Sequence, residues 1–279
     1  MVSRKPFWLP IGGHQVMNSE GVEAVGPPCP DEGVEPLAEW RERTEHFGSG
    51  SFFERLREHL TPGQSQEIQP LERVEGDRTG LAQHRPNRAF RELYEGEYIE
   101  PDTEPAHVDS FADPDEFTDR INPHFEDGTA YQVNCWECAR AVESTWRGSP
   151  EVAAGRATLP EELEPYGEVD DRSEAWYGQQ MRPTSAAEIR ETLLHAGEGS
   201  SVIATVQYRY LERGIWVGGG HAFNYLNCEG RILLVDGQSD KIAEASDRWP
   251  PDDWDSSVQP ISMTAMGWDR EGEVLWNSN

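Results

Sequence analysis

Asn134-Cys135-Trp136-Glu137-Cys138 marks the start of a predicted helix. Asn134 is a strong N-cap residue type, and Glu137 stands three residues later, which is the spacing of a capping box. Apolar residues then recur at helical spacing as far as Trp146, and Gly148 is a suitable stop. The spacing therefore predicts a helix that begins at Cys135.

The place of Cys135 at this helix start favours a reactive thiol. The first turn of a helix leaves N–H groups unpaired at the positive end of the helix dipole, where a thiolate is favoured over a thiol. A free cysteine that merely packs is the alternative, because Cys is among the most buried residue types. For Cys138, one turn further along the same face, this packing interpretation is the preferred one.

A β-hairpin downstream supplies an imidazole and a carboxylate. Two strand-like runs, 221–226 and 231–236, flank the turn-rich Asn227-Cys228-Glu229-Gly230. A two-residue turn at 228–229 would set His221 directly opposite Asp236, with their Cβ atoms about 4.5–5.5 Å apart. A three-residue loop with Gly230 in a bulge would move the register by one residue. The first register is favoured because it alone gathers four apolar side chains on the His221 face, namely Phe223, Tyr225, Ile232 and Leu234.

Cys135, His221 and Asp236 can together activate a nucleophile. In this hypothesis Cys135 attacks, His221 takes its proton and later delivers one to the leaving group, and Asp236 fixes the His221 tautomer. The N–H of Cys135 is a natural oxyanion donor. A structural histidine and an ordinary turn aspartate are the alternatives for His221 and Asp236. Three amide side chains are further oxyanion or substrate-binding candidates because they lie close to these residues in sequence: Gln132, Asn134 and Gln238.

These motifs, taken in order, resemble a known family. Asn134-Cys135-x-x-Cys138 precedes an amphipathic helix, and Gly220-His221-Ala222-Phe223-Asn224 and Asp236-Gly237-Gln238 follow downstream. This order is similar to that of the papain-fold toxin family, which includes protein-glutamine deamidase domains of bacterial polymorphic toxins. The upstream Arg120-Ile121-Asn122-Pro123-His124-Phe125 resembles the Asn-Pro entry to the cysteine motif in that family. The likeness covers residues 117–245, under half of the chain.

The resemblance implies a papain-like α+β fold, in which a helix presents Cys135 to a mostly antiparallel sheet that bears His221 and Asp236. It also implies an enzyme that attacks a carboxamide, with a protein as its substrate and with an immunity protein or a delivery apparatus as possible partners. In the favoured reading, Cys135 deamidates a glutamine side chain of the target through a thioester. The same groups would equally support peptide cleavage or transglutamination. No metal or cofactor is expected.

Two other classes compete for the same cysteines. A zinc site could use Cys135, Cys138, His221 and Cys228, but Cys228 at the hairpin tip is about 20 Å from His221 at the usual rise of a strand. A redox module would use Cys135-x-x-Cys138 at its helix start, although the upstream strand-helix-strand pattern is missing and the pairing of His221 with Asp236 stays unexplained. A non-catalytic interaction protein is the remaining alternative.

The chain is expected to divide near residue 113. Residues 1–112 form an accessory or delivery region, partly irregular, with short helices near residues 37–60, and residues 113–279 form the catalytic domain. Within the latter, Ser185 and Glu188 predict a capped helix that runs to about His195 and stops at Gly197. Residues 201–210 and 258–266 read as strands. Helices followed by a mostly antiparallel sheet predict an α+β arrangement.

The charge balance excludes some functions. The chain has 279 residues, and 52 Asp plus Glu against 24 Lys plus Arg give 52 − 24 = 28 excess negative charges. Binding to nucleic-acid phosphates or to an anionic membrane surface is therefore not expected. Lys5 and Lys241 are the only lysines, and mean hydropathy is −0.74. This composition suits a surface hydrated in high salt, so we hypothesise a halophilic source, with an acidic protein from a GC-rich genome as the alternative.

The sequence shows neither a membrane span nor a secretory signal. No run approaches the ~20 apolar residues of a crossing helix. Residues 1–10 begin with basic residues, but their apolar stretch is too short for a signal peptide. We therefore expect synthesis in the cytoplasm and, if the protein leaves the cell, export or injection by a dedicated secretion system.

Overall fold

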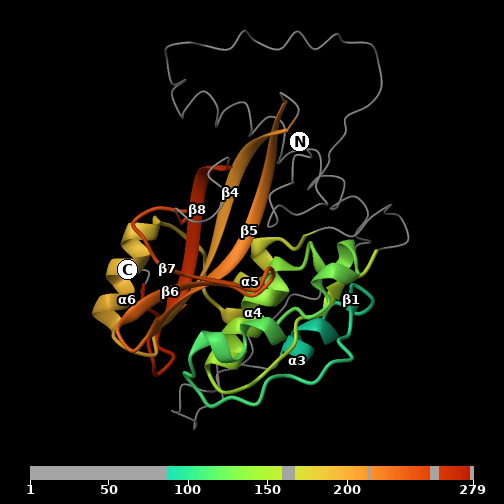
Figure 1. The fold of residues 1–279 in the computed structure, drawn as a ribbon, viewed down its shortest axis with the longest axis horizontal. Helices are drawn as coiled ribbons and strands as arrows, with labels where there is room; N and C mark the ends of the chain where they lie inside the picture. Colours follow the sequence, from blue (N-terminus) through green and yellow to red (C-terminus); the bar gives the residue numbers. More distant parts are fainter. Residues whose placement is uncertain (1–86, 159–166, 213–214, 252–257, 277–279) are drawn as a thin grey trace. The chain divides into compact units, whose positions relative to one another are not determined.

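The computed structural model describes residues 87–158, 167–212, 215–251 and 258–276 (Figure 1). The short helices predicted near residues 37–60, and the rest of the region before residue 87, lie outside the described residues. The predicted domain boundary near residue 113 stays a prediction.

A six-stranded antiparallel sheet forms the centre of the described part. Its strands follow the order β3-β8-β4-β5-β6-β7. The bounds are Arg182–Pro183 for β3, Ser201–Glu212 for β4, Ile215–Cys228 for β5, Arg231–Asp236 for β6, Lys241–Glu244 for β7 and Val258–Trp268 for β8. The predicted strands at 201–210, 231–236 and 258–266 are thus present. β5 begins six residues before the predicted strand, because β4 pairs with it from Glu212 opposite Ile215 onward.

Helices cover both faces of this sheet (Figure 1). On one face, α6 (Ala186–Ala196) buries Ile189 and Leu193 against Phe223 and Tyr225. On the other, α4 (Cys135–Trp146) packs Trp136 and Ala139 against Ala222. The described part is therefore an α+β fold, as predicted.

The ends of these helices follow the sequence signals closely. α6 begins after Ser185, whose Oγ accepts a hydrogen bond of 3.2 Å from the Glu188 N–H, and ends at Gly197 with φ +88°. α4 begins at Cys135 as predicted, and Gly148 follows its end with φ +88°. A positive φ favours glycine, so Gly148 and Gly197 stop their helices in the expected way.

The register predicted for the β5–β6 hairpin is wrong by two residues. Asn227 pairs with Ile232 and Cys228 with Arg231, so the two turn residues are Glu229 and Gly230. Both have positive φ, +53° and +83°, as a type I′ turn demands. Gly230 meets this demand at little cost, whereas the predicted turn at 228–229 has no glycine. A shift of two keeps every side chain on its face, so Phe223, Tyr225, Ile232 and Leu234 still share one cluster.

The segment before α4 wraps around that helix. It contains α3 (Asn87–Glu92), β1 (Tyr98–Ile99) and four short 3₁₀ helices: Pro114–Glu116, Thr118–Arg120, Phe125–Asp127 and Thr129–Tyr131. β1 pairs with β2 (Gly155–Arg156), which follows α4. A further helix, α5 (Asp170–Tyr177), lies between β2 and β3. Its apolar periodicity is weak because four of its first five residues are charged.

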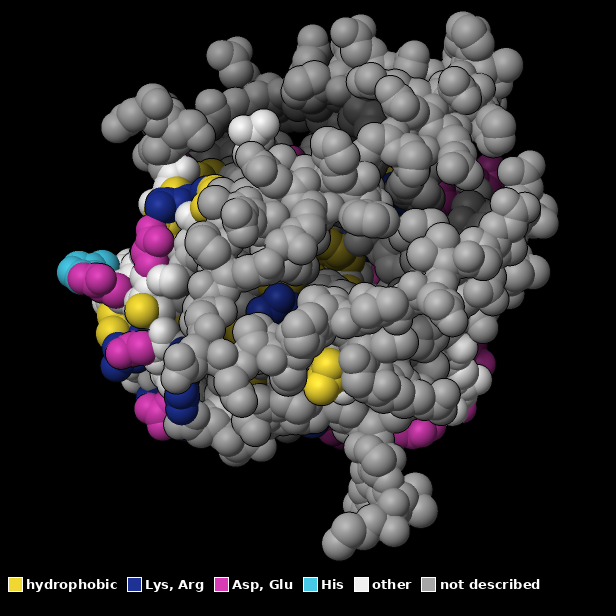
Figure 2. All heavy atoms as spheres, turned by 90° about the horizontal axis from the view of Figure 1, so that it is seen from above, with side chains coloured by type: hydrophobic (Ala, Val, Ile, Leu, Met, Phe, Trp, Pro, Cys, Tyr) yellow, Lys and Arg dark blue, Asp and Glu magenta, His cyan; other side chains and the backbone are white. Residues whose placement is uncertain are grey.

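The described surface carries acidic side chains. On the face seen in Figure 2, Asp and Glu side chains lie at the surface of the described part, several of them beside arginines. Exposed ion pairs of this kind include Arg190–Asp247 and Arg270–Glu198. Within the described ranges, none of the helices is long and apolar enough to cross a membrane.

Candidate active site

His221 and Asp236 form a buried pair beside the start of α4. His221 Nε2 lies 3.1 Å from Asp236 Oδ2, and the two side chains are 1 % and 0 % exposed. Asp236 also accepts hydrogen bonds from Ser239 Oγ (2.6 Å) and from the Gln238 N–H (3.0 Å). Burial alone would raise the pKa of Asp236, but His221 and these two donors hold it below its usual range. The carboxylate is therefore charged and held in a fixed position.

Cys135 approaches the same imidazole from the first residue of α4. Its side chain is half-buried, at the edge of the cluster that contains Trp136 and Ala222. Burial disfavours a charged imidazole, yet the carboxylate of Asp236 and the neighbouring Cys135 raise the pKa of His221 to about 10. His221 therefore interacts with both Asp236 and Cys135.

Asn134 occupies the N-cap position of α4 but does not cap the helix with its side chain. Its Nδ2 instead donates to Asn122 Oδ1 (3.2 Å) and to the Ala154 carbonyl (2.9 Å). Its Oδ1 accepts from Gln238 Nε2 at 3.1 Å. The predicted capping box is therefore wrong, because tertiary partners take up the Asn134 side chain.

The three amide candidates differ in how many of their amide hydrogens are already donated to other groups. Both hydrogens of Asn134 Nδ2 are already donated. Gln238 Nε2 donates one of its two hydrogens, to Asn134, from a position close to Asp236. Gln132 Nε2 donates to the Phe125 carbonyl (3.2 Å) and makes no bond to the other two.

Asn122 ties this amide cluster together. Its Nδ2 donates to the Gln238 carbonyl (3.0 Å) and to the Tyr131 carbonyl (2.9 Å), while its Oδ1 accepts from Asn134. The segment after Asp236 is thereby bound to the start of α4. The Asn122-Pro123 dipeptide belongs to the family resemblance, but nothing in its local pattern indicates these long-range bonds.

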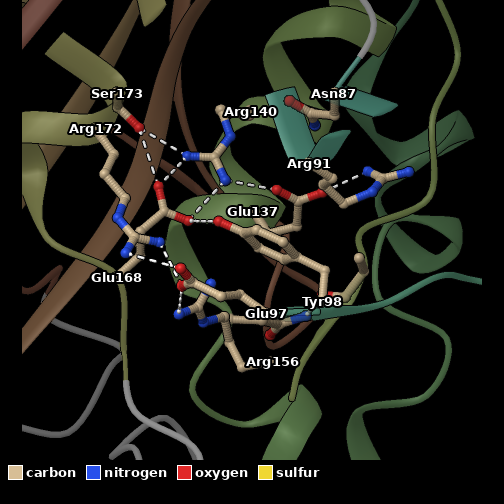
Figure 3. A network of polar contacts seen from close by, with 12 residues as sticks. Asn87, Arg91, Glu97, Tyr98, Glu137, Arg140, Arg156, Glu168, Arg172 and Ser173 are labelled. Carbon is tan, nitrogen blue, oxygen red and sulfur yellow. Dashed lines mark hydrogen bonds and ion pairs between the residues drawn. The ribbon is translucent and has the colours of Figure 1, made fainter. Parts of the chain in front are cut away.

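Glu137 has a different role from the one predicted. Its carboxylate is fully buried and contacts Arg91 Nη1 (2.6 Å) and Arg140 Nη2 (2.5 Å) instead of the backbone at Asn134 (Figure 3). Arg140 also bonds the fully buried Glu168 and the Ser173 hydroxyl, and its guanidinium lies 3.8 Å from the Phe90 ring centroid. A buried network of four charged side chains therefore stabilises the helix that carries Cys135. Its members are Arg91, Glu137, Arg140 and Glu168.

The charge network extends outward from this centre (Figure 3). Glu168 accepts from the Tyr98 hydroxyl at 2.7 Å. Glu97 pairs with Arg156 (3.2 Å) and with Arg172 (2.6 Å). An ion pair thus joins α3 to α4, and hydrogen bonds of Tyr98 and Ser173 join β1 and α5 to the network around Arg140. The sequence gives no signal for this network, because its members are scattered over 80 residues with no shared motif.

The three cysteines of the described part do not gather into a metal site. Cys138 is 1 % exposed in the cluster with Val142 and Leu226, so its packing interpretation is confirmed. Cys135, Cys138 and Cys228 all have free thiols. Within the described ranges, no three His, Cys, Asp or Glu side chains gather as metal ligands would. The geometry therefore gives no support to the zinc alternative.

Comparison with known proteins gives one match. Searches of curated proteins and of solved structures found no similar protein. A scan against protein families found one region of similarity, and it includes Cys135, His221 and Asp236. Residues 133–241 match the family described as papain fold toxin 1, glutamine deamidase, which is the family that the sequence motifs predicted.

Proposed function

We propose that this protein is a cysteine-dependent hydrolase that deamidates glutamine side chains of a target protein. The observation that carries the proposal is the position of His221 between Cys135 and Asp236, with Nε2 3.1 Å from the carboxylate. The match of residues 133–241 to a glutamine deamidase family supports the choice of substrate.

The roles follow from the two ring nitrogens of the His221 imidazole. Asp236 holds Nε2, which leaves Nδ1 for the thiol of Cys135. With its pKa raised to about 10, His221 is basic enough to take the proton of the attacking thiol and become an imidazolium. The buried carboxylate of Asp236 stabilises that charge.

The reaction then proceeds in two steps. The Cys135 sulfur attacks Cδ of the glutamine side chain, the C–N bond breaks, and His221 delivers its proton to the departing ammonia. Water, deprotonated by His221, then attacks the thioester, and the C–S bond breaks to give glutamate and the free thiol.

Two groups support the oxyanion that forms in each step. The N–H of Cys135 stands in the first turn of α4, where helix N–H groups lack helical partners. Gln238 Nε2 has a second hydrogen that is not donated to Asn134. Asn134 itself positions Gln238, because its own amide hydrogens are both engaged.

Intact mass spectrometry of candidate target proteins tests the proposal. Deamidation exchanges NH₂ for OH and adds about one mass unit per site, with release of ammonia. We expect this shift with the wild-type chain and with Cys138→Ala, because Cys138 only packs, and its loss with Cys135→Ala. Fragments would indicate a peptidase and a crosslink a transglutaminase. Full activity of Cys135→Ala would overturn the assignment.

A further inference from the structure

β5 has a free edge immediately before His221. Its ladder with β6 covers Asn224–Cys228, whereas its ladder with β4 continues out to Ile215. β6 ends at Asp236, and the chain then turns toward α4. A Cβ on Gly237 would lie 2.6 Å from Val142. Within the described ranges, no strand pairs with residues 215–223 on the β6 side.

The direction of the backbone groups along β5 can be worked out from its paired end. The Asn227 N–H donates to the Ser200 carbonyl (2.9 Å), and its own carbonyl accepts from the Gly199 N–H (2.9 Å), so Asn227 faces the β4 side. Successive residues of a strand direct their N–H and C=O groups to alternate edges. Residues with even numbers therefore face the β6 side, which at Gly218 and Gly220 is the free edge.

Packing requires glycine at only one of the three glycine positions along this edge. A Cβ on Gly219 would lie 2.7 Å from the Tyr208 hydroxyl, so packing explains that glycine. At Gly218 and Gly220 the nearest atoms to an added Cβ are carbonyl oxygens 3.9 Å away, and both residues are exposed. Packing does not require glycine at these two positions. Their bare backbone leaves the edge open to another chain.

An open edge next to a nucleophile suits an extended substrate. Exposed strand edges promote unwanted pairing, and proteins usually protect them. Added strands gain affinity from main-chain hydrogen bonds, with side chains free on alternate faces. His221 follows Gly220 directly, so a segment paired here passes Cys135 within a few residues at about 3.3 Å each.

We propose that the β5 edge at Gly218–Gly220 binds an extended segment of the target protein as an additional strand and brings its glutamine to Cys135. The substrate class is therefore glutamine in an extended or unfolded segment, not in a helix. This inference rests on the proposed function.

Backbone methylation of a peptide substrate tests the inference. The probe is a pool of decapeptides with one central glutamine and varied flanking residues, given to the full-length chain, with ammonia release as the readout. Two further pools carry N-methyl groups at alternate positions, one pool on each parity relative to the glutamine. Strand pairing uses the N–H groups of one parity only, so kcat/KM should fall about 10-fold in one pool, from two lost hydrogen bonds, and stay within about 3-fold in the other.

A variant of the protein gives a second measurement. Gly220→Pro removes the outward N–H without touching a bond to β4, and strand edges tolerate proline. We expect kcat/KM for the unmethylated pool to fall several-fold, with the unfolding midpoint checked alongside. If the variant fails to fold, the methylated pools still decide.

The outcomes separate the two proposals. If kcat/KM falls equally for both N-methylated pools, the strand-pairing inference is wrong, whereas the proposed deamidation is unaffected. Turnover of helical glutamines in folded proteins, without turnover of the peptide pool, would overturn it as well. Absence of ammonia release from any peptide or protein would instead overturn the proposed function.

Discussion

His221 Nε2 lies 3.1 Å from Asp236 Oδ2, although the β5–β6 ladder ends one pair short of Asp236, at Asn224 opposite Val235. The two side chains meet diagonally across the end of the hairpin, on the same face of the sheet. Because the observed register differs from the predicted one by two residues, His221 and Asp236 still point to the same face of the sheet. The pair therefore forms although the predicted register is wrong.

Asp236→Asn should shift the alkaline limit of activity to lower pH. The carboxylate, together with the neighbouring Cys135, raises the pKa of His221 to about 10, above the unperturbed value near 6.5, so the imidazolium persists well above neutral pH. Without that charge, His221 should lose its proton at a lower pH. The measurement is the pH profile of kcat/KM or of Cys135 alkylation. An unchanged alkaline limb in the variant would show that Asp236 does not control the imidazole.

Arg140→Met should destabilise the fold strongly. The substitution leaves Glu137 and Glu168 buried without their shared guanidinium, and breaking a buried ion pair in this way costs about 3–5 kcal/mol. Arg190→Met is the matched control, because the Arg190–Asp247 pair is exposed at 3.5 Å and should contribute less than about 1 kcal/mol. Denaturant unfolding measures both. Equal effects of the two variants would mean that the network behind α4 contributes no more than a surface pair.

Glu151→Gln should weaken the decline of the unfolding free energy between about pH 4 and pH 7. Burial raises the pKa of Glu151 to about 7, although its carboxylate accepts from the Asn87 N–H (2.8 Å) at the start of α3. A folded-state pKa above the unfolded value means that the stability contributed by this group is complete at pH 4 and is lost as pH rises through 7. We expect unfolding free energies of the wild type to decline over this window by on the order of 1 kcal/mol, and those of the variant to decline less. Parallel curves would contradict this role.

The local signals in the sequence predicted much of the fold because they act over a few residues. Cys135 as a helix start, Gly148 as a stop and the Ser185 cap all depend on neighbours within one turn. The continuous apolar run in 231–236 likewise indicated a buried strand, and β6 has five of its six residues buried.

Long-range partners account for what the sequence missed. Asn134 and Glu137 have the spacing of a capping box, but Asn122 and Ala154 bind the first and Arg91 and Arg140 the second. Asn122, Ala154 and Arg91 are 12 to 46 residues away in sequence, and local propensity carries no information about them. Arg140 is only three residues from Glu137, but it belongs to the same buried ion-pair network. The candidate triad was accessible because the hairpin brings His221 and Asp236 together through short-range pairing.

The acidic composition predicts a response to salt. The chain carries 28 excess negative charges, whose mutual repulsion weakens as salt screens it. We expect the unfolding midpoint to rise steadily as KCl increases from about 0.1 M to several molar. A midpoint that is indifferent to salt would contradict the halophilic hypothesis and favour a merely acidic protein.

Covalent labelling of the thiol tests the central claim most directly. A glutamine-containing peptide with a chloromethyl ketone in place of the side-chain amide should alkylate the wild-type chain once, and peptide mapping should find the label on Cys135. The buried thiol of Cys138 should remain free, and His221→Ala should slow labelling by at least about 100-fold, the lower end of the usual contribution of a general base. A label on Cys138 or Cys228, or equal labelling of Cys135 without His221, would contradict the account.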